Sequence, residues 1–288
     1  MKTIKEIRNE ANLLYSRSSH YITGTFFAVT GIVAVAKSVL DIIGAEVNIP
    51  YLYLIAALFS PIEYGMVKAS LLAYEHRAKE VKTASFTFAG IKKYFKIMIP
   101  FVGRTLVIYL VQVLTLMIFV YVSSHSLDEL ATALRVVFTG NVESLFSDGA
   151  ITIFLGTLLG IVVAIIIGFI VQSYFSLSYY YVIEDEMGLF ASLAASVKSM
   201  KGHFMTYIGL RLTYLPYVLI SAIIVNAFSV ALTTMFQQLL TILPSVSIFV
   251  FNLILAVLIG LISTLISIMI YKVKETLAIT VFYKEVRK

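Results

Sequence analysis

Long apolar runs recur along the whole chain, and they restrict its fold more than any other feature. Each run exceeds the ~20 residues that an α-helix needs to cross the hydrocarbon core of a bilayer. Of the 288 residues, 60% are hydrophobic and 13% are charged, whereas soluble domains carry about 25% charged residues. The ~10-residue alternating segments of a membrane barrel do not occur in the sequence. The sequence therefore predicts an all-α, polytopic membrane protein.

The apolar runs predict six transmembrane helices within a single domain, residues 1–288. Their approximate ranges are 20–44, 50–73, 97–122, 150–174, 205–229 and 246–271. We expect a cytoplasmic amphipathic helix at residues 1–19 before the first span. Residues 123–149 are expected to form an extracytoplasmic loop, and residues 272–288 a cytoplasmic C-terminal tail.

The distribution of basic residues predicts the orientation of these spans. Seventeen Lys and Arg residues lie in the N-terminus, in the segments after spans two and four, and in the C-terminus. The alternate side carries only Arg135, together with Lys37 near the end of span one. Basic residues accumulate on the cytoplasmic side of membrane proteins, so both termini are predicted to be cytoplasmic. The net charge of +6 is thus attributed to topology, and no nucleic-acid partner is expected.

Three local patterns refine the predicted spans. Pro216 is expected to kink span five, because proline removes a helical hydrogen bond. The stretch "GTLLG", Gly156–Gly160, has the spacing of small residues that allows close packing of two membrane helices. The tyrosine-rich stretch "YFSLSYYYVI", residues 174–183, is typical of an aromatic belt at the membrane surface.

Three stretches of the sequence look alike and suggest a repeat. They are "LYSRSSHYITGTFF", "GIKKYFKIMIPFVGRTL" and "SVKSMKGHFMTYIGLRL", and each places basic residues and an aromatic pair before an apolar span. The repeated unit would be a surface helix followed by a transmembrane hairpin, with its symmetry axis along the membrane normal. The alternative is that these stretches share only the features of any cytoplasmic entry point in a lysine-rich protein.

Ionisable residues inside the predicted spans mark a candidate polar cluster, since each costs ~2.5–3.5 kcal/mol in a bilayer unless it pairs or lines a cavity. The charged candidates are Glu63, Lys68, Arg104 and Arg211, and the uncharged polar residue Gln172 is grouped with them. Glu63 and Lys68 are about 140° apart on a helix and do not face each other, so we expect Glu63 to pair with Arg104 or Arg211. One interpretation is a polar cavity open to the cytoplasm that receives a substrate or partner. The other is a structural ion-pair network with arginines that reach the lipid phosphates.

Five basic or aromatic residues are predicted to contact lipid or a partner at the cytoplasmic surface. They are Lys92, Lys93, Lys198, Lys201 and His203, and a lysine near an anionic surface contributes about 1 kcal/mol. Gly202 is expected to end a surface helix, Leu189–Lys201, as the residue after its C-cap. The chain would then turn into span five.

Motifs of catalysis and cofactor binding do not occur. The four histidines are not paired at ligand spacing, and HExxH is missing, so no metal site is predicted. A phosphate-binding loop of the GxxxxGK[ST] type is also missing, which excludes an ATPase built on that loop within this chain. The sequence therefore predicts no catalytic residue and no cofactor.

One sequence pattern supports a family resemblance. The stretch "EDEMGLFASLAASVKSMKGH" contains Ser196, Met200, Lys201, Gly202 and His203 in an S-x-x-x-M-K-G-H order. Near the C-terminus, Ala278, Phe282 and Tyr283 form an A-x-x-x-F-Y pattern. The stretches "IKEIRNEANLL", "SPIEYGMVKASLLAY" and "SFTFAGIKKYF" precede them. In this order the chain resembles the bacterial six-helix membrane proteins described as domain of unknown function 975. The resemblance implies the six-helix fold and a multi-pass location in the bacterial plasma membrane, and it implies no established activity.

Three functions are compatible with these predictions. The first is a non-enzymatic protein of the cell envelope that acts through partners in export, peptide immunity or envelope maintenance. The second is the permease subunit of an ATP-driven exporter, with residues 76–96 contacting a separate ATPase. The third is an intramembrane lipid-modifying enzyme, which would need acid, base or metal groups converging at one depth.

Overall fold

The computed structural model describes residues 1–44, 63–81, 94–123, 150–242 and 248–288, which form helices and turns without a strand. The α-helices are α1 (Ile4–Gly44), α3 (Tyr64–Tyr74), α5 (Tyr94–Ser123), α7 (Ala150–Tyr174), α8 (Ser178–Glu184), α9 (Leu189–Met200), α10 (Phe204–Leu212), α11 (Leu215–Ile242), α12 (Ile248–Ser267) and α13 (Val273–Val286). A short 3-10 helix, η2 (Ala78–Glu80), follows α3, and a π-helical turn, η4 (Ile268–Lys272), joins α12 to α13.

Five helical stretches of the described chain are long and apolar enough to cross a membrane. They are Ile4–Ala36, Ile97–Phe119, Leu158–Glu184, Phe204–Gln238 and Val250–Val286. Each overlaps one of the six predicted spans, and together they identify an all-helical, multi-pass membrane protein. Most of the remaining predicted span, residues 50–62, lies outside the described residues, as do the predicted loop 124–149 and the middle copy of the predicted surface helix.

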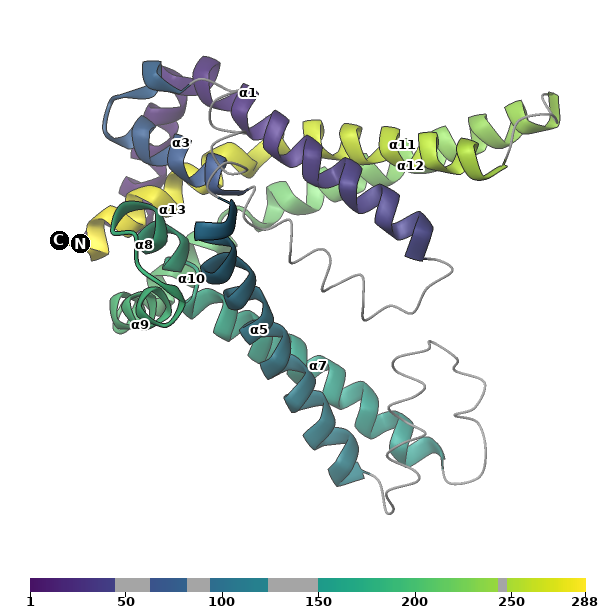
Figure 1. Cartoon of the computed structure of the whole chain (residues 1–288), viewed down its shortest axis with the longest axis horizontal. Coiled ribbons are helices and arrows are strands. Elements are labelled where there is room, and N and C mark those ends of the chain that lie inside the picture. The colour runs from purple at the N-terminus through teal and green to yellow at the C-terminus, as the bar shows by residue number, and fades with distance from the viewer. Residues whose placement is uncertain (45–62, 82–93, 124–149, 243–247) are drawn as a thin grey trace.

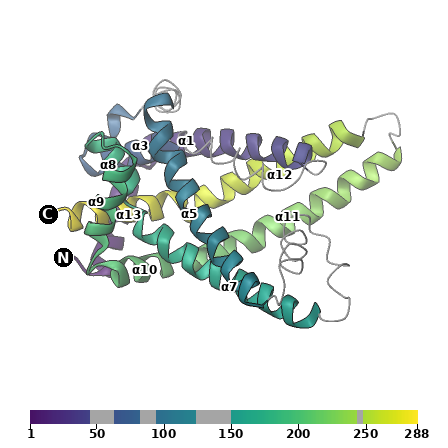
Figure 2. The ribbon, with the colours of Figure 1, turned by 60° about the horizontal axis from the view of Figure 1, so that its bottom comes forward.

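The helices form a compact base from which two arms diverge (Figures 1 and 2). The base contains α3, α8, α9, α10, α13 and the first half of α1, and both chain termini lie there. One arm, the α5–α7 arm, is a pair of helices packed along each other. The other, the α1–α11–α12 arm, contains the second half of α1 packed on α12, with α11 alongside.

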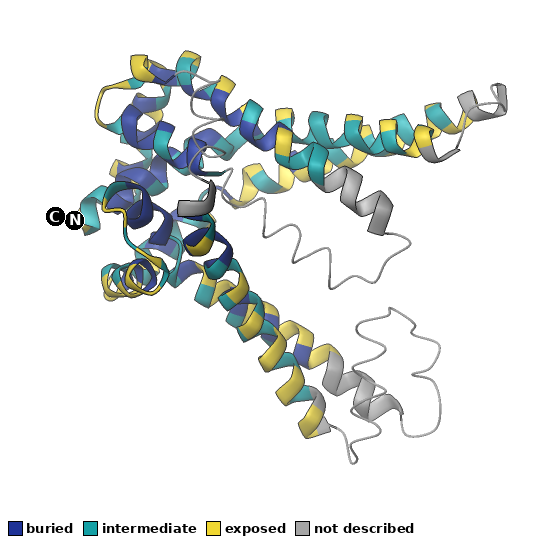
Figure 3. Ribbon diagram, in the orientation of Figure 1, coloured by how far each residue is buried: buried dark blue, intermediate teal, exposed yellow. Residues whose placement is uncertain are grey.

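Exposed residues line the arms, whereas buried residues concentrate in the base (Figure 3), and many of the exposed residues on the arms are large and apolar. Ile118 and Ile165 on the α5–α7 arm are 61% and 60% exposed, and Ile223 on α11 is 69% exposed. Soluble proteins rarely expose contiguous apolar patches of such extent. The arms therefore match the hydrocarbon core of a bilayer, and the base matches the more polar membrane surface.

Close packing within the α5–α7 arm depends on small residues of α7. A Cβ on Gly160 would lie 2.7 Å from the Cβ of Phe119 and 3.3 Å from Leu116 on α5. Glycine thus allows the two helices to approach each other, as the "GTLLG" pattern predicts for this residue.

Helix α13 lies at the centre of the base and supplies much of its core. Its most deeply buried side chains, all with no exposed surface, are Leu277, Ala278, Val281, Phe282 and Tyr283. They pack against α1, α3 and α10. The segment predicted as a cytoplasmic tail, residues 272–288, is therefore a core helix, because its apolar residues at spacings of three and four form one continuous face.

Helix α1 runs without interruption from the base into an arm. It begins with a capping box, in which the Thr3 backbone N–H donates to Glu6 at 2.7 Å and the Glu6 N–H donates to the Thr3 hydroxyl at 3.3 Å. No break separates the predicted surface helix 1–19 from the predicted span 20–44. One continuous helix therefore covers both predicted segments, and the boundary between residues 19 and 20 stays a prediction.

The third of the three similar stretches, "SVKSMKGHFMTYIGLRL", differs from the first, because here the chain breaks between helices α10 and α11. Helix α10 ends at Leu212, two turn residues follow, and α11 starts at Leu215 with Pro216 in its first turn. Proline is favourable there because its missing N–H would have no helical partner. The kink was predicted at Pro216 itself, but the chain breaks just before it, at Thr213 and Tyr214, and α11 then continues as one helix to Ile242.

Gly202 forms the turn between α9 and α10. Helix α9 ends at Met200 with Lys201 as its C-cap, and Gly202 has a φ of +84°. His203 then donates its N–H to the Met200 carbonyl at 2.9 Å and caps the start of α10. The prediction of Gly202 as the residue after the C-cap is confirmed, with the helix one residue shorter than expected.

We expect Gly202→Ser to destabilise the protein by about 1 kcal/mol, because a Cβ disfavours a positive φ. Space is not the cause, since no atom lies within 4 Å of a Cβ built on Gly202. Gly188→Ser is the matched control: that site is equally open, its φ is −71°, and serine suits its N-cap position. Thermal unfolding in detergent should show a lower midpoint for the first variant alone. Equal midpoints for the two variants would contradict a backbone effect at Gly202.

Candidate functional site

A polar cavity of about 220 Å³ lies where the two arms meet the base. Its walls come from the start of α3, from α5, the end of α7, α8, α10, η4 and α13. The polar and charged lining residues are Glu63, Arg104, Gln172, Ser176, Tyr179, Tyr180, Tyr207, Arg211, Lys272, Glu275 and Thr276. Five charged groups from four separate segments of the chain thus converge on one small volume.

Arg104 is the most deeply buried cation of this cavity, with 9% of its surface exposed. Its Nε donates a hydrogen bond to the Phe175 carbonyl at 3.0 Å. Its guanidinium lies over the ring of Tyr179, 4.3 Å from the centroid, and Tyr179 in turn stacks on Phe101 at 4.0 Å. Because α5 supplies both Phe101 and Arg104, one helix fixes the aromatic stack and the orientation of the guanidinium.

Arg211 and Glu275 form the ion pair of the cavity. The Arg211 Nε lies 3.3 Å from a Glu275 carboxylate oxygen, and the Glu275 side chain is 15% exposed. The pair connects α10 to α13, the central helix of the base. Arg211 therefore carries its own counter-charge.

The π-helical turn η4 changes the register of the chain at the edge of the cavity. Lys272 lines the polar cavity, whereas the preceding Tyr271 lines a second cavity, of about 390 Å³, between α11 and α12. Such turns are rare and occur frequently at functional sites. Here two consecutive polar side chains of the π-turn line different cavities.

Four of the five predicted cluster residues line this one cavity: Glu63, Arg104, Gln172 and Arg211. Lys68 is half-buried on α3 and is not among the residues that line it. The predicted pairing of Glu63 is wrong within the described chain, since no ion pair joins it to either arginine. Arg211 pairs instead with Glu275, and Arg104 bonds to a main-chain carbonyl.

The sequence did not indicate that buried tyrosines line the cavity. Tyr179 and Tyr180 come from the stretch predicted as an interfacial belt, yet they are buried on α8. Their neighbour Ser176 lines the same cavity. One feature of the sequence could have indicated this: the tyrosine-rich stretch directly follows an apolar run that is already long enough to cross the bilayer, so its tyrosines lie beyond the span.

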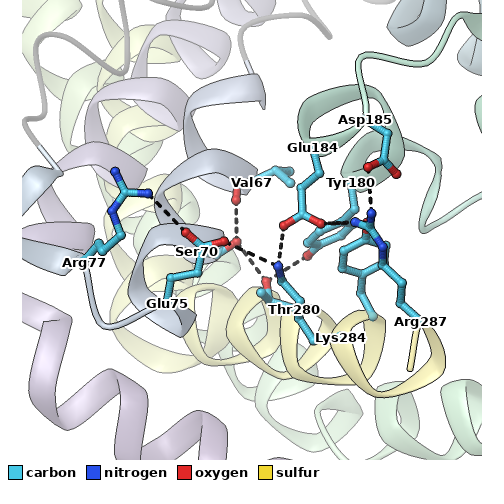
Figure 4. A network of polar contacts seen from close by, with 11 residues as sticks. Val67, Ser70, Glu75, Arg77, Tyr180, Glu184, Asp185, Thr280, Lys284 and Arg287 are labelled. Carbon is cyan, nitrogen blue, oxygen red and sulfur yellow. Dashed lines mark hydrogen bonds and ion pairs between the residues drawn. The ribbon is translucent and has the colours of Figure 1, made fainter.

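A network of polar contacts beside the cavity ties the C-terminus to the rest of the base (Figure 4). Lys284 and Arg287 both donate to the Glu184 carboxylate, and the Tyr283 hydroxyl donates to it at 3.0 Å. Arg287 also donates to Asp185 at 2.7 Å. The acidic end of α8 is thereby paired with α13. We call these five residues the C-terminal clamp.

A separate chain of hydroxyl groups lies near the clamp, in the core of the base (Figure 4). Thr280 donates to the Ser70 hydroxyl at 2.9 Å, Ser70 donates to the Val67 carbonyl at 2.8 Å, and Tyr180 lies 3.1 Å from Thr280. Every hydroxyl therefore has a partner, as buried polar groups require. This chain holds α3, α8 and α13 in register around the cavity wall.

The N-terminus is fastened to the same helix. Lys2 donates to Glu10 at 2.6 Å and lies 3.0 Å from Glu285 on α13. The hydrogen bond to Glu10 is the largest contribution that raises the pKa of Lys2 above its ordinary value, and it outweighs the opposing effect of burial. The two termini are therefore held side by side in the base.

The predicted surface contacts fall into two groups. Lys198 and Lys201 are exposed at the end of α9, and His203 is half-buried beside them. Lys92 and Lys93 lie outside the described residues. The described part of this surface is therefore open to lipid or to a partner.

Comparison of the chain with family models, with curated proteins and with solved structures gave no match. The resemblance to the six-helix family remains a prediction.

Proposed function

We propose that this chain is a six-span protein of the bacterial plasma membrane that acts without catalysis in export, peptide immunity or envelope maintenance. Its working site would be the polar cavity at the junction of the two arms, open to the cytoplasm. Membrane lipids and a separate membrane protein or ATPase would be its partners, with Lys198 and Lys201 at the contacting surface.

One observation carries this proposal: five charged side chains converge on a cavity of about 220 Å³ between lipid-facing arms. Charged groups at membrane depth are expensive, and in membrane proteins they generally line substrate or ion pathways. The clustering of both termini in the base supports an even number of crossings. The basic residues at that end support its assignment to the cytoplasm.

Cysteine labelling tests both the cavity and its orientation, because the chain contains no cysteine. Gln172→Cys places a thiol on the cavity wall. A membrane-impermeant maleimide should modify this thiol in inverted vesicles but not in intact cells. Leu110→Cys, on the lipid-facing surface of α5 where Leu110 is 58% exposed, should remain unmodified in both preparations.

Gln238→Cys, near the far end of α11, completes the test and should be modified only in intact cells. Modification of Gln172→Cys only from outside would show that the orientation is inverted. Failure of the reagent to reach Gln172→Cys from either side would show that the cavity is closed to the cytoplasm. Either outcome would overturn the proposal.

A further inference from the structure

We propose that the cavity binds a phosphate-type anion, with Arg104 as its principal ligand. This inference rests on the proposed function, because it assigns a class of ligand to the same cavity. A phospholipid headgroup and a free phosphate solute share this chemistry, and the experiment below distinguishes them.

The guanidinium of Arg104 has more donors than the protein uses. Of its five N–H groups, the one on Nε bonds to Phe175 and another contacts the Tyr179 hydroxyl, while no carboxylate of the described chain pairs with it. The side chain is nine-tenths buried and lines the cavity. A buried, charged donor costs free energy unless it is paired, so the two Nη groups are expected to meet an acceptor that enters the cavity.

Ser176 supplies a second, independent indication. Its hydroxyl is buried against the same cavity and has no hydrogen-bond partner among the described residues. A buried, unsatisfied hydroxyl is unfavourable and calls for a specific reason. Ser176 directly follows Phe175, whose carbonyl accepts from Arg104. The hydroxyl and the guanidinium therefore belong to one corner of the cavity.

The charge balance of the cavity favours an anion in this corner. Arg211 is neutralised by Glu275, and Lys272 forms no ion pair with any described residue. Arg104 and Lys272 then face Glu63 as the single remaining carboxylate. A planar guanidinium binds phosphate oxygens through two parallel hydrogen bonds, and Arg104 has enough N–H groups for them beyond those used by Phe175 and Tyr179.

The experiment measures thermal stability of the purified protein in detergent by circular dichroism. Three additions are compared: phosphatidylglycerol, inorganic phosphate, and a diacylglycerol with the same acyl chains. A ligand that binds only the folded state raises the unfolding midpoint as its concentration increases, so each series yields an apparent affinity. We expect a rise with phosphatidylglycerol, with phosphate, or with both, and no rise with the diacylglycerol.

Arg104→Gln should weaken the binding about tenfold or more, because it removes a charged donor from the anion. Ser176→Ala should weaken it about fivefold without lowering the midpoint of the free protein, since the hydroxyl has no partner to lose. This second variant keeps the test decisive if Arg104→Gln fails to fold. Arg8→Gln is the control, because Arg8 lies over another aromatic ring, Tyr214, and does not line the cavity.

Stabilisation by phosphatidylglycerol alone would identify a lipid headgroup, and stabilisation by inorganic phosphate would identify a soluble anion. No stabilisation of the wild type by either, or equal stabilisation of the wild type and of Ser176→Ala and Arg104→Gln, would overturn the inference. These failures would leave the labelling of Gln172→Cys from the cytoplasmic side unchanged, so the proposed function would be judged separately.

Discussion

Deletion of residues 273–288 is expected to prevent folding. The deletion removes α13, whose five fully buried side chains fill the centre of the base. Burial of a large apolar side chain contributes about 1.5–3 kcal/mol, so this helix contributes on the order of 8 kcal/mol. That amount is comparable with the entire stability of a typical domain.

Size-exclusion chromatography of an N-terminal fluorescent fusion measures the effect directly. The truncated chain should elute as aggregate or be degraded. A chain shortened by Lys288 alone should elute as the full-length protein does, since the Lys288 side chain is 65% exposed. A monodisperse peak for the protein without residues 273–288 would show that α13 is dispensable, and the core described above would be wrong.

Glu184→Ala is expected to reduce the stability by about 3 kcal/mol, because it breaks a buried ion pair and leaves its partners unsatisfied. The Glu184 side chain is 13% exposed, and it receives hydrogen bonds from Lys284, Arg287 and Tyr283. Lys284 is itself only 19% exposed. Loss of the carboxylate therefore leaves the Tyr283 hydroxyl without its acceptor and leaves Lys284 with only its longer contact to Glu75, at 3.5 Å.

The control for this prediction is Glu80→Ala, which removes an exposed ion pair with Arg77 at 2.6 Å. Exposed pairs contribute little, because water screens them and two side chains lose freedom. Unfolding midpoints in detergent should fall markedly for Glu184→Ala and barely for Glu80→Ala. Similar midpoints for the two variants would mean that the C-terminal clamp is solvated and has no structural role.

Features that depend on local chemistry could be predicted from the sequence. The apolar runs located five long helices, and Pro216 and Gly202 marked the two breaks around α10. Each of these depends on one residue type or on a stretch of neighbours, so no knowledge of distant contacts was needed. For the same reason, the depth of Arg104 and Arg211 in their spans pointed to a shared polar region.

Features that depend on distant contacts could not be predicted in this way. Glu63 faces the cavity without pairing with an arginine, because Glu275 on a distant helix reaches Arg211 instead. Residues 272–288 carry many charges and were predicted to be a tail. Their apolar face has the helical spacing of a core segment, but only the packing of α1, α3 and α10 shows that it is covered.

Because the two arms diverge from the base, a small rotation of one arm at the base would displace its far end by a larger distance. Helix α5 has 30 residues, which corresponds to a length of about 45 Å, and its arm meets the rest of the described chain mainly through α8, α9 and α10. A rotation of roughly 10° about this fulcrum would move the tip of such a helix by about 8 Å. A sub-ångström adjustment around Arg104, close to the fulcrum, would therefore be magnified severalfold at the opposite face of the membrane.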